Sequence, residues 1–314
     1  MASEREKEFY KRMLELETEI SKKWFEMQGI GREKIIYQMF TTHNSLFHYT
    51  TMSGLLGIVE NNCFWLTNLK YMNDLSEQKF AYEIVNNTIN KLKCDKCYSS
   101  KFINIINRSS SINTYRADRY AACFTSDGDS LPMWCMYGKE SGVSIEFDLT
   151  SNFHFTIGPN CFFEDIIYDC NILVEFVKIV VDLYHAAYNE FIYDSSSTFN
   201  STLENILSME LSSKVVSHVD NFKNKRFSHE SETRLLYSWK NDAKIKHRVK
   251  NNLIVPYVEM PTKDLNNGKL LPITSIIIGP GEEQELVKQS VEDFIRAKGY
   301  DVEIKKSEIP YRSR

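Results

Sequence analysis

The first 40 residues carry an apolar stripe that is typical of an amphipathic helix. Apolar side chains recur every three or four residues, with charged residues between them, at Phe9, Met13, Leu16, Ile20, Trp24 and Met27. This period places them on one helix face. Because the stripe is nearly a heptad seam, it suits packing on the rest of the chain and equally a homodimer or another partner. We therefore expect a helical N-terminal extension over residues 1–40 and a main domain over 41–314.

Short apolar runs alternate with helical periods in the next part of the chain. The runs predict strands at 46–50, 63–67, 120–125 and 142–147. Thr51 has the position of an N-cap for a helix through Val59. Asp74 and Glu77 have the spacing of a capping box before a helix that runs toward Leu92.

The second half of the chain contains a long helical region followed by strands. Residues from about 171 to 222 repeat with a helical period, interrupted by three serines at 195–197. Later segments predict strands at 227–239, 253–255, 276–278 and 302–304, and a helix at 283–298. Since strands and helices do not alternate regularly, we expect an α+β fold with a mixed, mostly antiparallel sheet and a helical insertion at about 171–222.

Composition excludes several classes of protein. The net charge of -4 disfavours a protein that coats nucleic acid by bulk charge. No run of about 18 apolar residues predicts a membrane span, and the charged N-terminus lacks a signal core. The 7 cysteines are an odd number spread over 314 residues, which favours reduced thiols in the cytoplasm over a disulfide framework.

Charged residues alternate from Glu230 to Arg234, inside the strand expected at 227–239. Alternate strand residues share a face, so Glu230, Glu232 and Arg234 point to the same side. Two carboxylates about 7 Å apart on one strand face suit a reaction that develops positive charge on a sugar carbon and needs a base. An ion pair with Arg234 that has no chemical role explains the same pattern.

Two aromatic segments are further candidates for a binding site. His48 lies in the strand between Phe47 and Tyr49, where it is either a core residue or a hydrogen-bond donor to a ligand. Trp134 and Tyr137 are three residues apart and share one face of a helical turn. Their rings either fill the core or stack on a flat heterocycle.

Other motifs predict less. Asn73 and Asp74 suit a helix cap better than a site, and Cys94-x-x-Cys97 lacks the second ligand pair of a zinc site, so we expect no metal. Residues 223–250 are locally basic, which is typical of a solvated surface or of a groove for a phosphate-bearing ligand.

Six clusters together resemble the bacterial domain of unknown function 2971 family over about residues 45 to 312. They appear in the family's order: Leu46 to Thr50; Trp65 to Thr67 with Asn73, Asp74 and Glu77; Cys123 to Thr125 with Met133, Trp134, Tyr137 and Gly138; Glu230, Glu232 and Arg234; Ile277 to Pro280; and Ser307 to Arg312. The strand histidine, central aromatic cluster and late glutamate are also similar to the His-Tyr-Glu layout of ADP-ribosyltransferases. Glu230-x-Glu232 is similar to the Glu-x-Glu motif of the branch of those enzymes that modifies arginine.

The second resemblance implies a split sheet, NAD as substrate and three roles. His48 would hold a ribose hydroxyl or the carboxamide of NAD, and Tyr137 or Trp134 would stack on nicotinamide. Glu232 would stabilise the oxocarbenium-like transition state, while Glu230 would orient or deprotonate the acceptor. The full set of expected catalytic and NAD-binding residues is His48, Tyr49, Thr50, Trp65, Asn73, Trp134, Tyr137, Glu230, Glu232 and Arg234.

Three functions remain open from the sequence. The first is an ADP-ribosyltransferase or NAD glycohydrolase that modifies RNA, DNA or protein, with the role of a toxin or anti-phage defence effector. The second is a catalytically inactive nucleotide- or nucleic-acid-binding module of the same fold. The third is a protein that binds a partner through the helix of residues 1–40.

Overall fold

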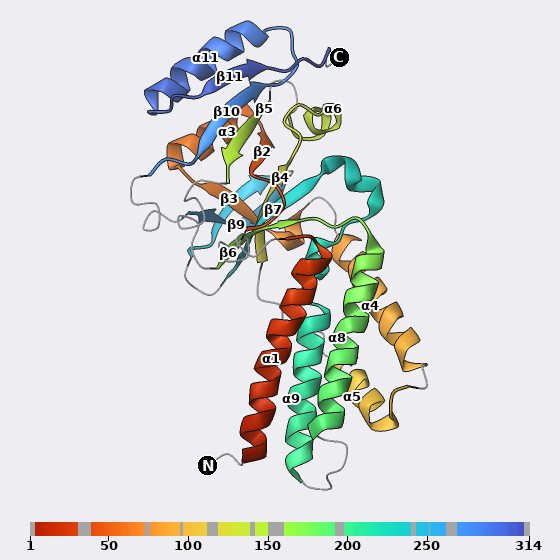
Figure 1. The fold of residues 1–314 in the computed structure, drawn as a ribbon. Helices are drawn as coiled ribbons and strands as arrows, with labels where there is room; N and C mark the ends of the chain where they lie inside the picture. Colours follow the sequence, from red (N-terminus) through yellow and green to blue (C-terminus); the bar gives the residue numbers. More distant parts are fainter. Residues whose placement is uncertain are drawn as a thin grey trace. The chain divides into compact units, whose positions relative to one another are not determined.

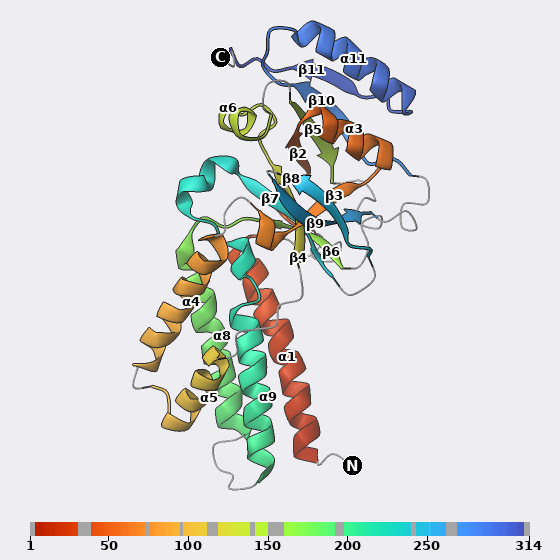
Figure 2. The ribbon, with the colours of Figure 1, turned by 180° about the vertical axis from the view of Figure 1, so that it is seen from behind.

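The computed structural model describes residues 4–30, 39–72, 76–94, 97–111, 119–138, 142–149, 160–191, 198–239, 243–250, 252–261 and 269–310. The chain forms two compact units, each assembled from separated segments. The helical unit comprises Met1–Gly31, Asp74–Arg116 and Ile167–Lys225. The sheet unit comprises Arg32–Asn73, Ala117–Ile166 and Arg226–Arg314 (Figures 1 and 2).

This division differs from the expected one. The N-terminal helix is not a separate extension, because it belongs to the same unit as the insertion at about 171–222 and as residues 74–116. The sequence predicts helices over residues 1–40, from Glu77 toward Leu92 and over about 171–222, but not that three distant segments share one core.

Five α-helices lie in the described part of the helical unit. They are α1 (Glu4–Met27), α4 (Ser76–Lys93), α5 (Ser100–Ser111), α8 (Cys170–Phe191) and α9 (Thr198–Val215). Helices α1, α8 and α9 run side by side in both views (Figures 1 and 2), and α5 packs on α9. None of the described helices is long and apolar enough to cross a membrane.

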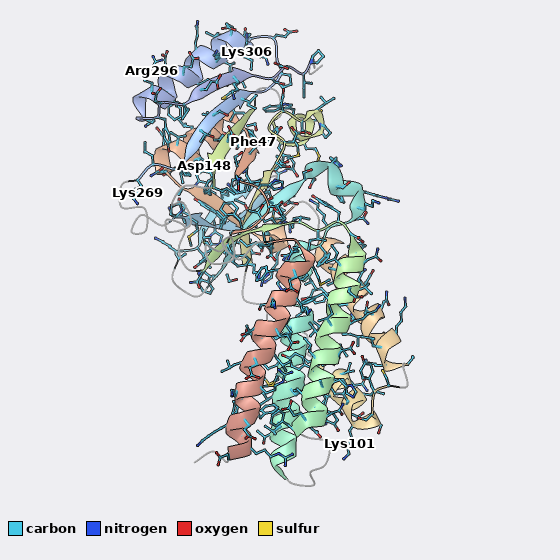
Figure 3. All side chains as sticks on the ribbon, in the orientation of Figure 1. Phe47, Lys101, Asp148, Lys269, Arg296 and Lys306 are labelled. Carbon is cyan, nitrogen blue, oxygen red and sulfur yellow. The ribbon has the colours of Figure 1, made fainter. Side chains whose placement is uncertain are left out.

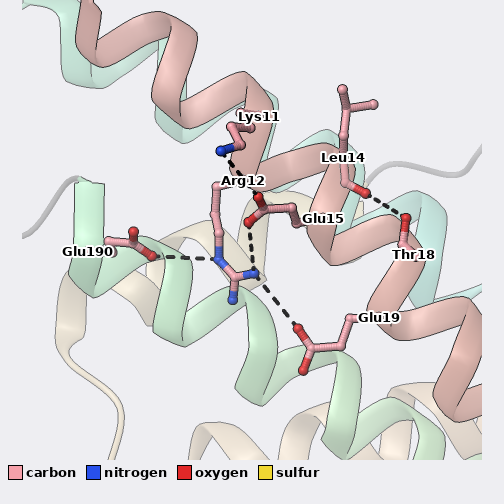
Figure 4. A network of polar contacts seen from close by, with 7 residues as sticks. All are labelled: Lys11, Arg12, Leu14, Glu15, Thr18, Glu19 and Glu190. Atoms are coloured by element: carbon pink, nitrogen blue, oxygen red, sulfur yellow. Dashed lines mark hydrogen bonds and ion pairs between the residues drawn. The ribbon is translucent and has the colours of Figure 1, made fainter.

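The apolar stripe of α1 is buried within this unit. Phe9, Leu16, Ile20 and Trp24 are at most 2% exposed and pack with α8 residues such as Phe176. At its surface Arg12 lies 3.7 Å from Glu15, 3.8 Å from Glu19 and 3.6 Å from Glu190 of α8 (Figure 4). Because these four side chains pack inside the helical unit, they do not form an apolar surface that a partner could contact.

The sheet unit contains eleven strands, mostly antiparallel. They are β1 (Met39–Phe40), β2 (Ser45–Thr50), β3 (Phe64–Asn68), β4 (Arg119–Thr125), β5 (Val143–Asp148), β6 (Cys161–Asp165), β7 (Glu232–Ser238), β8 (Lys246–Lys250), β9 (Leu253–Met260), β10 (Ile273–Ile278) and β11 (Glu303–Lys306). The order is β1-β6-β7-β4-β2-β5-β10-β11, with β3-β9-β8 branching from β4. Of the described strand pairs, β1–β6 and β10–β11 are parallel and the others are antiparallel. The expected α+β fold with a mixed sheet is confirmed.

The sheet divides at β4. One edge of β4 pairs with β7 from Arg119 to Thr125. The other edge pairs with β3 at Tyr120 and Ala121 and with β2 at Thr125 alone. Between these points, over 122–124, no described strand pairs with this edge, so β2 and β3 leave β4 in different directions. We call this unpaired stretch of backbone the opening; the side chains of Ala122 and Phe124 within it are buried in the sheet core.

Shorter elements cover the sheet. Helix α3 (Met52–Asn61) follows β2, with Thr51 as its N-cap accepting a hydrogen bond from Gly54 N, as the sequence predicts. Helix α11 (Gln284–Ala297) buries Val291 and Ile295 in the large sheet core. The expected Trp134–Tyr137 turn is also helical, formed by α6 (Leu131–Met133) and a π-helix (Trp134–Gly138).

The strand expected at 227–239 is shorter than predicted. Lys225–Glu230 form a 3₁₀-helix, and β7 begins only at Glu232. Between them Ser231 has a φ of 41°, a left-handed conformation that a strand cannot continue through. The prediction that Glu230 and Glu232 alternate on one strand face is therefore wrong.

Candidate functional site

The strand register assigns the candidate residues to two faces of the sheet. Residues paired across a ladder point to the same face, and Glu232 pairs with Thr125, Thr125 with Phe47, and Phe47 with Glu146. Figure 3 labels Phe47 on β2. We call this face, which carries many polar residues, the polar face: Phe47, Tyr49, Cys123, Thr125, Ser144, Glu146, Glu164, Glu232, Arg234 and Ser275.

His48 points to the opposite face, because it follows Phe47 in the same strand. Its Nδ1 lies 2.7 Å from Cys123 O, at the opening in β4. A carbonyl oxygen only accepts, so Nδ1 carries the proton and donates. The ring therefore spans the gap that β2 leaves when it separates from β4. His48 Nε2 makes no hydrogen bond with any described residue.

The electrostatic surroundings keep His48 neutral. Burial lowers the pKa of His48 below its ordinary value of 6.5, partly countered by the hydrogen bond to Cys123. The positive charges of Arg248 and Lys250 lower it further. With Nδ1 protonated, a neutral ring presents Nε2 as an acceptor. The sequence predicts that His48 donates a hydrogen bond to a ligand, whereas this tautomer offers Nε2 as an acceptor.

Glu232 and Arg234 form a buried ion pair on the polar face. Arg234 Nε donates to Glu232 Oε1 at 2.6 Å and Nη2 to Oε2 at 3.1 Å. Their side chains are 5% and 3% exposed. Glu164 of β6, also buried, lies directly opposite Arg234 in the ladder. A bidentate contact of this kind fixes both side chains, and it is the ion pair with Arg234 that the strand pattern predicts.

Glu230 is buried at the end of the 3₁₀-helix, 3% exposed. It does not lie on β7 and does not share a strand face with Glu232. The expected arrangement of two carboxylates along one strand is absent from this described segment. The structure therefore removes the geometric reason for assigning Glu230 as the group that orients an acceptor.

Tyr49 and Trp134 are structural residues of the polar face. The Tyr49 hydroxyl donates to Asp127 O at 3.0 Å and accepts from Ser130 N at 2.8 Å. Trp134 Nε1 donates to Asp129 Oδ1 at 2.7 Å, and its ring meets Tyr49 edge-on at 4.7 Å. Because Trp134 is 2% exposed, it cannot stack on nicotinamide as expected.

The C-terminal motif contacts Asp129, the hydrogen-bond partner of Trp134, and the glycine motif lies against the Trp134 ring itself. Ser307 Oγ donates to Asp129 Oδ1 at 2.5 Å, and Glu308 N donates to Asp129 Oδ2 at 3.0 Å. A Cβ on Gly279 would lie 2.9 Å from the Trp134 ring. Several of the clusters that carry the family resemblance therefore surround the buried Trp134 ring and Asp129. Their contacts there give these clusters a structural role in the fold.

Tyr137 and Thr50 lie near Tyr49 and Trp134 but make different contacts. Tyr137 is partly buried in the small cluster with Phe47, Tyr49 and Trp134, so it lies on the polar face. Thr50 Oγ1 sits against Gly54, where an added Cβ would lie 1.9 Å away. The three residues expected to converge thus divide: Glu232 and Tyr137 lie on the polar face, and His48 on the other. Asn73 lies outside the described residues.

A cluster of aromatic and cationic residues lies beyond the opening, on the β3-β9-β8 branch. The Arg248 guanidinium lies 5.3 Å from the ring centroids of both Trp65 and Tyr257, and Nη2 donates to Thr67 Oγ1 at 2.7 Å. Arg248 Nε and Trp65 Nε1 are buried and have no hydrogen-bond partner among the described residues. We call these four residues the arginine cluster.

The sequence indicates Trp65 and the basic run as candidates but does not predict that they form the arginine cluster. Arg248 and Trp65 are far apart in the chain, and only the pairing of β3 and β8 with β9 joins them. The hydrophobic periodicity within one segment cannot predict a contact between residues of two distant strands. The aromatic content of β3 and β9 beside a basic strand was the one available hint.

In comparison with known proteins, part of the chain is similar to one family, and that family has no described activity. Residues 133–235 match the family model described as protein of unknown function (DUF2971). The match includes Trp134, Tyr137 and the Glu232–Arg234 pair, whereas His48 and the arginine cluster lie outside it. Neither the curated proteins nor the solved structures gave a match.

Proposed function

We propose that the sheet unit is an ADP-ribosyltransferase-like module that binds NAD at the opening beside β4. The observation that carries this proposal is the position of His48, whose Nδ1 bonds to Cys123 O and whose Nε2 makes no hydrogen bond with a described residue. A neutral imidazole of this tautomer accepts a hydrogen bond from a hydroxyl such as those of a ribose.

The charges near the opening support a phosphate-bearing ligand. Arg248 and Lys250 act on His48 strongly enough to lower its pKa. A pyrophosphate would neutralise such charges, and an arginine held by aromatic rings is already ordered for a phosphate. The two buried N–H groups of the arginine cluster leave donor capacity for a ligand or water.

Ligand-induced stabilisation tests the binding proposal. NAD, ADP-ribose and AMP are titrated in a calorimeter and in thermal unfolding, with wild type and His48→Asn. Ligand at about 100 times its Kd should stabilise the wild type by roughly 2.7 kcal/mol. Since a lost hydrogen bond is worth about 1 kcal/mol, His48→Asn should bind several-fold more weakly.

The matched control is His229→Asn, which changes an exposed histidine of the same unit. It should bind like the wild type. The unliganded melting temperature of His48→Asn separates a folding defect from a binding defect. Binding that is equal in wild type and His48→Asn, or no binding of any of the three ligands, would contradict the proposal.

Transfer of ADP-ribose is a second candidate function, favoured by one observation. Glu232 begins β7, which borders β4 on the edge opposite the opening, and its carboxylate is held rigidly by Arg234. In this reaction the bond from the ribose C1′ to nicotinamide breaks, an acceptor N–H or O–H adds to C1′, and nicotinamide and a proton leave. A fixed carboxylate stabilises the cationic carbon.

Nicotinamide release, with and without RNA, DNA or protein acceptor, tests transfer and hydrolysis together. Glu232→Gln should lose on the order of 10²-fold in rate. Glu146→Gln, on the same face and bonded to Ser275 Oγ at 2.7 Å, is the control and should retain activity. Expression of the wild type alone would then deplete cellular NAD, as a toxin would.

The two candidates predict different results. NAD binding without nicotinamide release supports an inactive module and rejects transfer. Release at an unchanged rate in folded Glu232→Gln rejects the role of Glu232. His48 and Glu232 lie on opposite faces, so turnover also requires that NAD reach both through the opening.

A further inference from the structure

The β8–β9 hairpin is the most basic segment of the sheet unit. Residues 243–258 contain Lys244, Lys246, His247, Arg248 and Lys250 and no acidic residue. Glu259, next in the chain, pairs with Lys246 at 2.6 Å. The hairpin therefore has a positive charge on a chain whose net charge is -4, and that charge favours an anionic partner.

The cations of β8 share one face with the aromatic rings of the branch. Lys246, Arg248 and Lys250 alternate along the strand, so they point to the same side. Lys246 pairs with Tyr257 in the ladder, and Tyr257 pairs with Thr67 of β3. This face, which we call the cationic face, thus includes the arginine cluster.

The open edge of β8 gives a long ligand access to this face. Among the described strands, β8 pairs with β9 alone. Lys244 and Lys250 are exposed, and Arg248 and Trp65 are partly exposed. A polymer can lie along such an edge strand, whereas a small ligand would leave most of the row unused.

We propose that the cationic face binds single-stranded nucleic acid. Alternate residues of an antiparallel strand are about 6.8 Å apart, so the cations form a row along the strand. Such a row of positive charge can track the backbone of a single strand, which carries one negative charge per nucleotide. The Arg248 guanidinium, already stacked on Trp65 and Tyr257, adds a flat cationic surface for a base.

The aliphatic residues of the hairpin argue for a polymer over a membrane. Val249 and Ile254, 77% and 70% exposed, pair with each other and point away from the cationic face. A bilayer binds lysines and aliphatic groups from one side of an element. On this hairpin Val249 and Ile254 lie opposite the lysines, and among its described residues only Leu253, 55% exposed, is an exposed aliphatic residue on the cationic face, so a lipid surface would meet the lysines with this one aliphatic group.

Fluorescence anisotropy with labelled oligo(dT) and oligo(U) of about 12 residues tests the proposal, because site sizes reach about 4 to 16 nucleotides. No NAD is added, so strand binding is measured independently of the proposed NAD site. With Lys244, Arg248 and Lys250 engaged, and Lys246 already paired with Glu259, a slope of about -0.7 per contact lowers the affinity roughly 18-fold between about 50 mM and 200 mM salt.

The double variant Lys244→Gln/Lys250→Gln removes the two exposed lysines. With one contact left, the same change in salt should lower the affinity only about 2.6-fold. The control Lys298→Gln/Lys305→Gln makes the same change of charge on α11 and β11 and should keep the wild-type slope. Circular dichroism and the melting temperature establish that each variant is folded.

Three results would overturn the proposal. They are no binding of either oligonucleotide by the wild type, an unchanged salt slope in the hairpin variant, and an equal loss in the control. Val249→Ser/Ile254→Ser should bind oligonucleotide like the wild type. If this variant instead loses binding, or if only vesicles of phosphatidylserine bind the wild type, the partner is of another class.

Discussion

The buried Glu232–Arg234 pair yields a quantitative prediction. Arg234→Met replaces the guanidinium by an apolar chain of similar length and leaves the Glu232 carboxylate buried without it. Both side chains are at most 5% exposed, so water does not restore the lost contact. Breaking one partner of such a pair costs about 3–5 kcal/mol, which is a large share of the roughly 5–15 kcal/mol that stabilises a domain.

Urea unfolding followed by tryptophan fluorescence measures the loss. Of the 4 tryptophans, Trp65, Trp134 and Trp239 lie in the sheet unit, so the signal reports mainly on that unit. The double variant Arg234→Met/Glu232→Gln should recover much of the stability, because neither charge then remains buried. An exposed pair supplies the control: Lys298→Met, which breaks the contact with Glu60, should cost at most about 1 kcal/mol.

A loss below about 1 kcal/mol in Arg234→Met would refute the reasoning, because it would show that the carboxylate is solvated or repaired by other groups. Strict additivity in the double variant would refute it also. The measurement bears on catalysis, since Glu232→Gln must be assayed at a temperature where it remains folded.

Three further predictions test the surroundings of the site. Gly279→Ala puts a Cβ 2.9 Å from the Trp134 ring and 3.0 Å from Gly142 O, so overpacking should cost about 1–3 kcal/mol in urea unfolding; an unchanged midpoint would disprove the contact. Tyr49→Phe removes the hydroxyl that joins two backbone groups of the 126–130 turn and should cost about 1–3 kcal/mol, read as a lower melting temperature. Burial lowers the pKa of His48 from 6.5, so the unfolded chain binds that proton more readily and stability falls as pH drops below about 6.5; His48→Asn should lack this part of the pH dependence, and an identical slope would contradict it.

Local patterns in the sequence predict most individual elements. The α1 stripe, the Thr51 cap, strands β2 to β5 and helix α11 all follow from periodicity and capping, because these depend on neighbours within a few residues. The Ser100–Ser111 helix is missed because it is rich in serine and asparagine, which favour turns. Its burial of Phe102 and Ile105 against α9 comes from tertiary packing.

Elements that depend on distant partners are not predictable in this way. The extension of the expected strand back to residue 227 ignores Ser231, whose positive φ is imposed by the turn into β7. The face that each residue occupies depends on which strands pair. His48 and Glu232 therefore appear alike in the sequence, as polar residues in apolar strands, although the register turns them to opposite faces.

The break in the sheet at β4 determines what the candidate residues can do together. In a continuous sheet, side chains on opposite faces never contact one ligand. Here β2 pairs with β4 at a single residue, and His48 closes the gap through Cys123 O, a bond that a ligand hydroxyl at Nε2 leaves intact. If NAD binds on the His48 side alone, Glu232 keeps a purely structural role and its removal lowers stability without changing affinity. If NAD passes through the opening, the same substitution lowers turnover beyond what its loss of stability explains. Measuring stability, affinity and nicotinamide release on the same Glu232→Gln protein therefore separates the two arrangements.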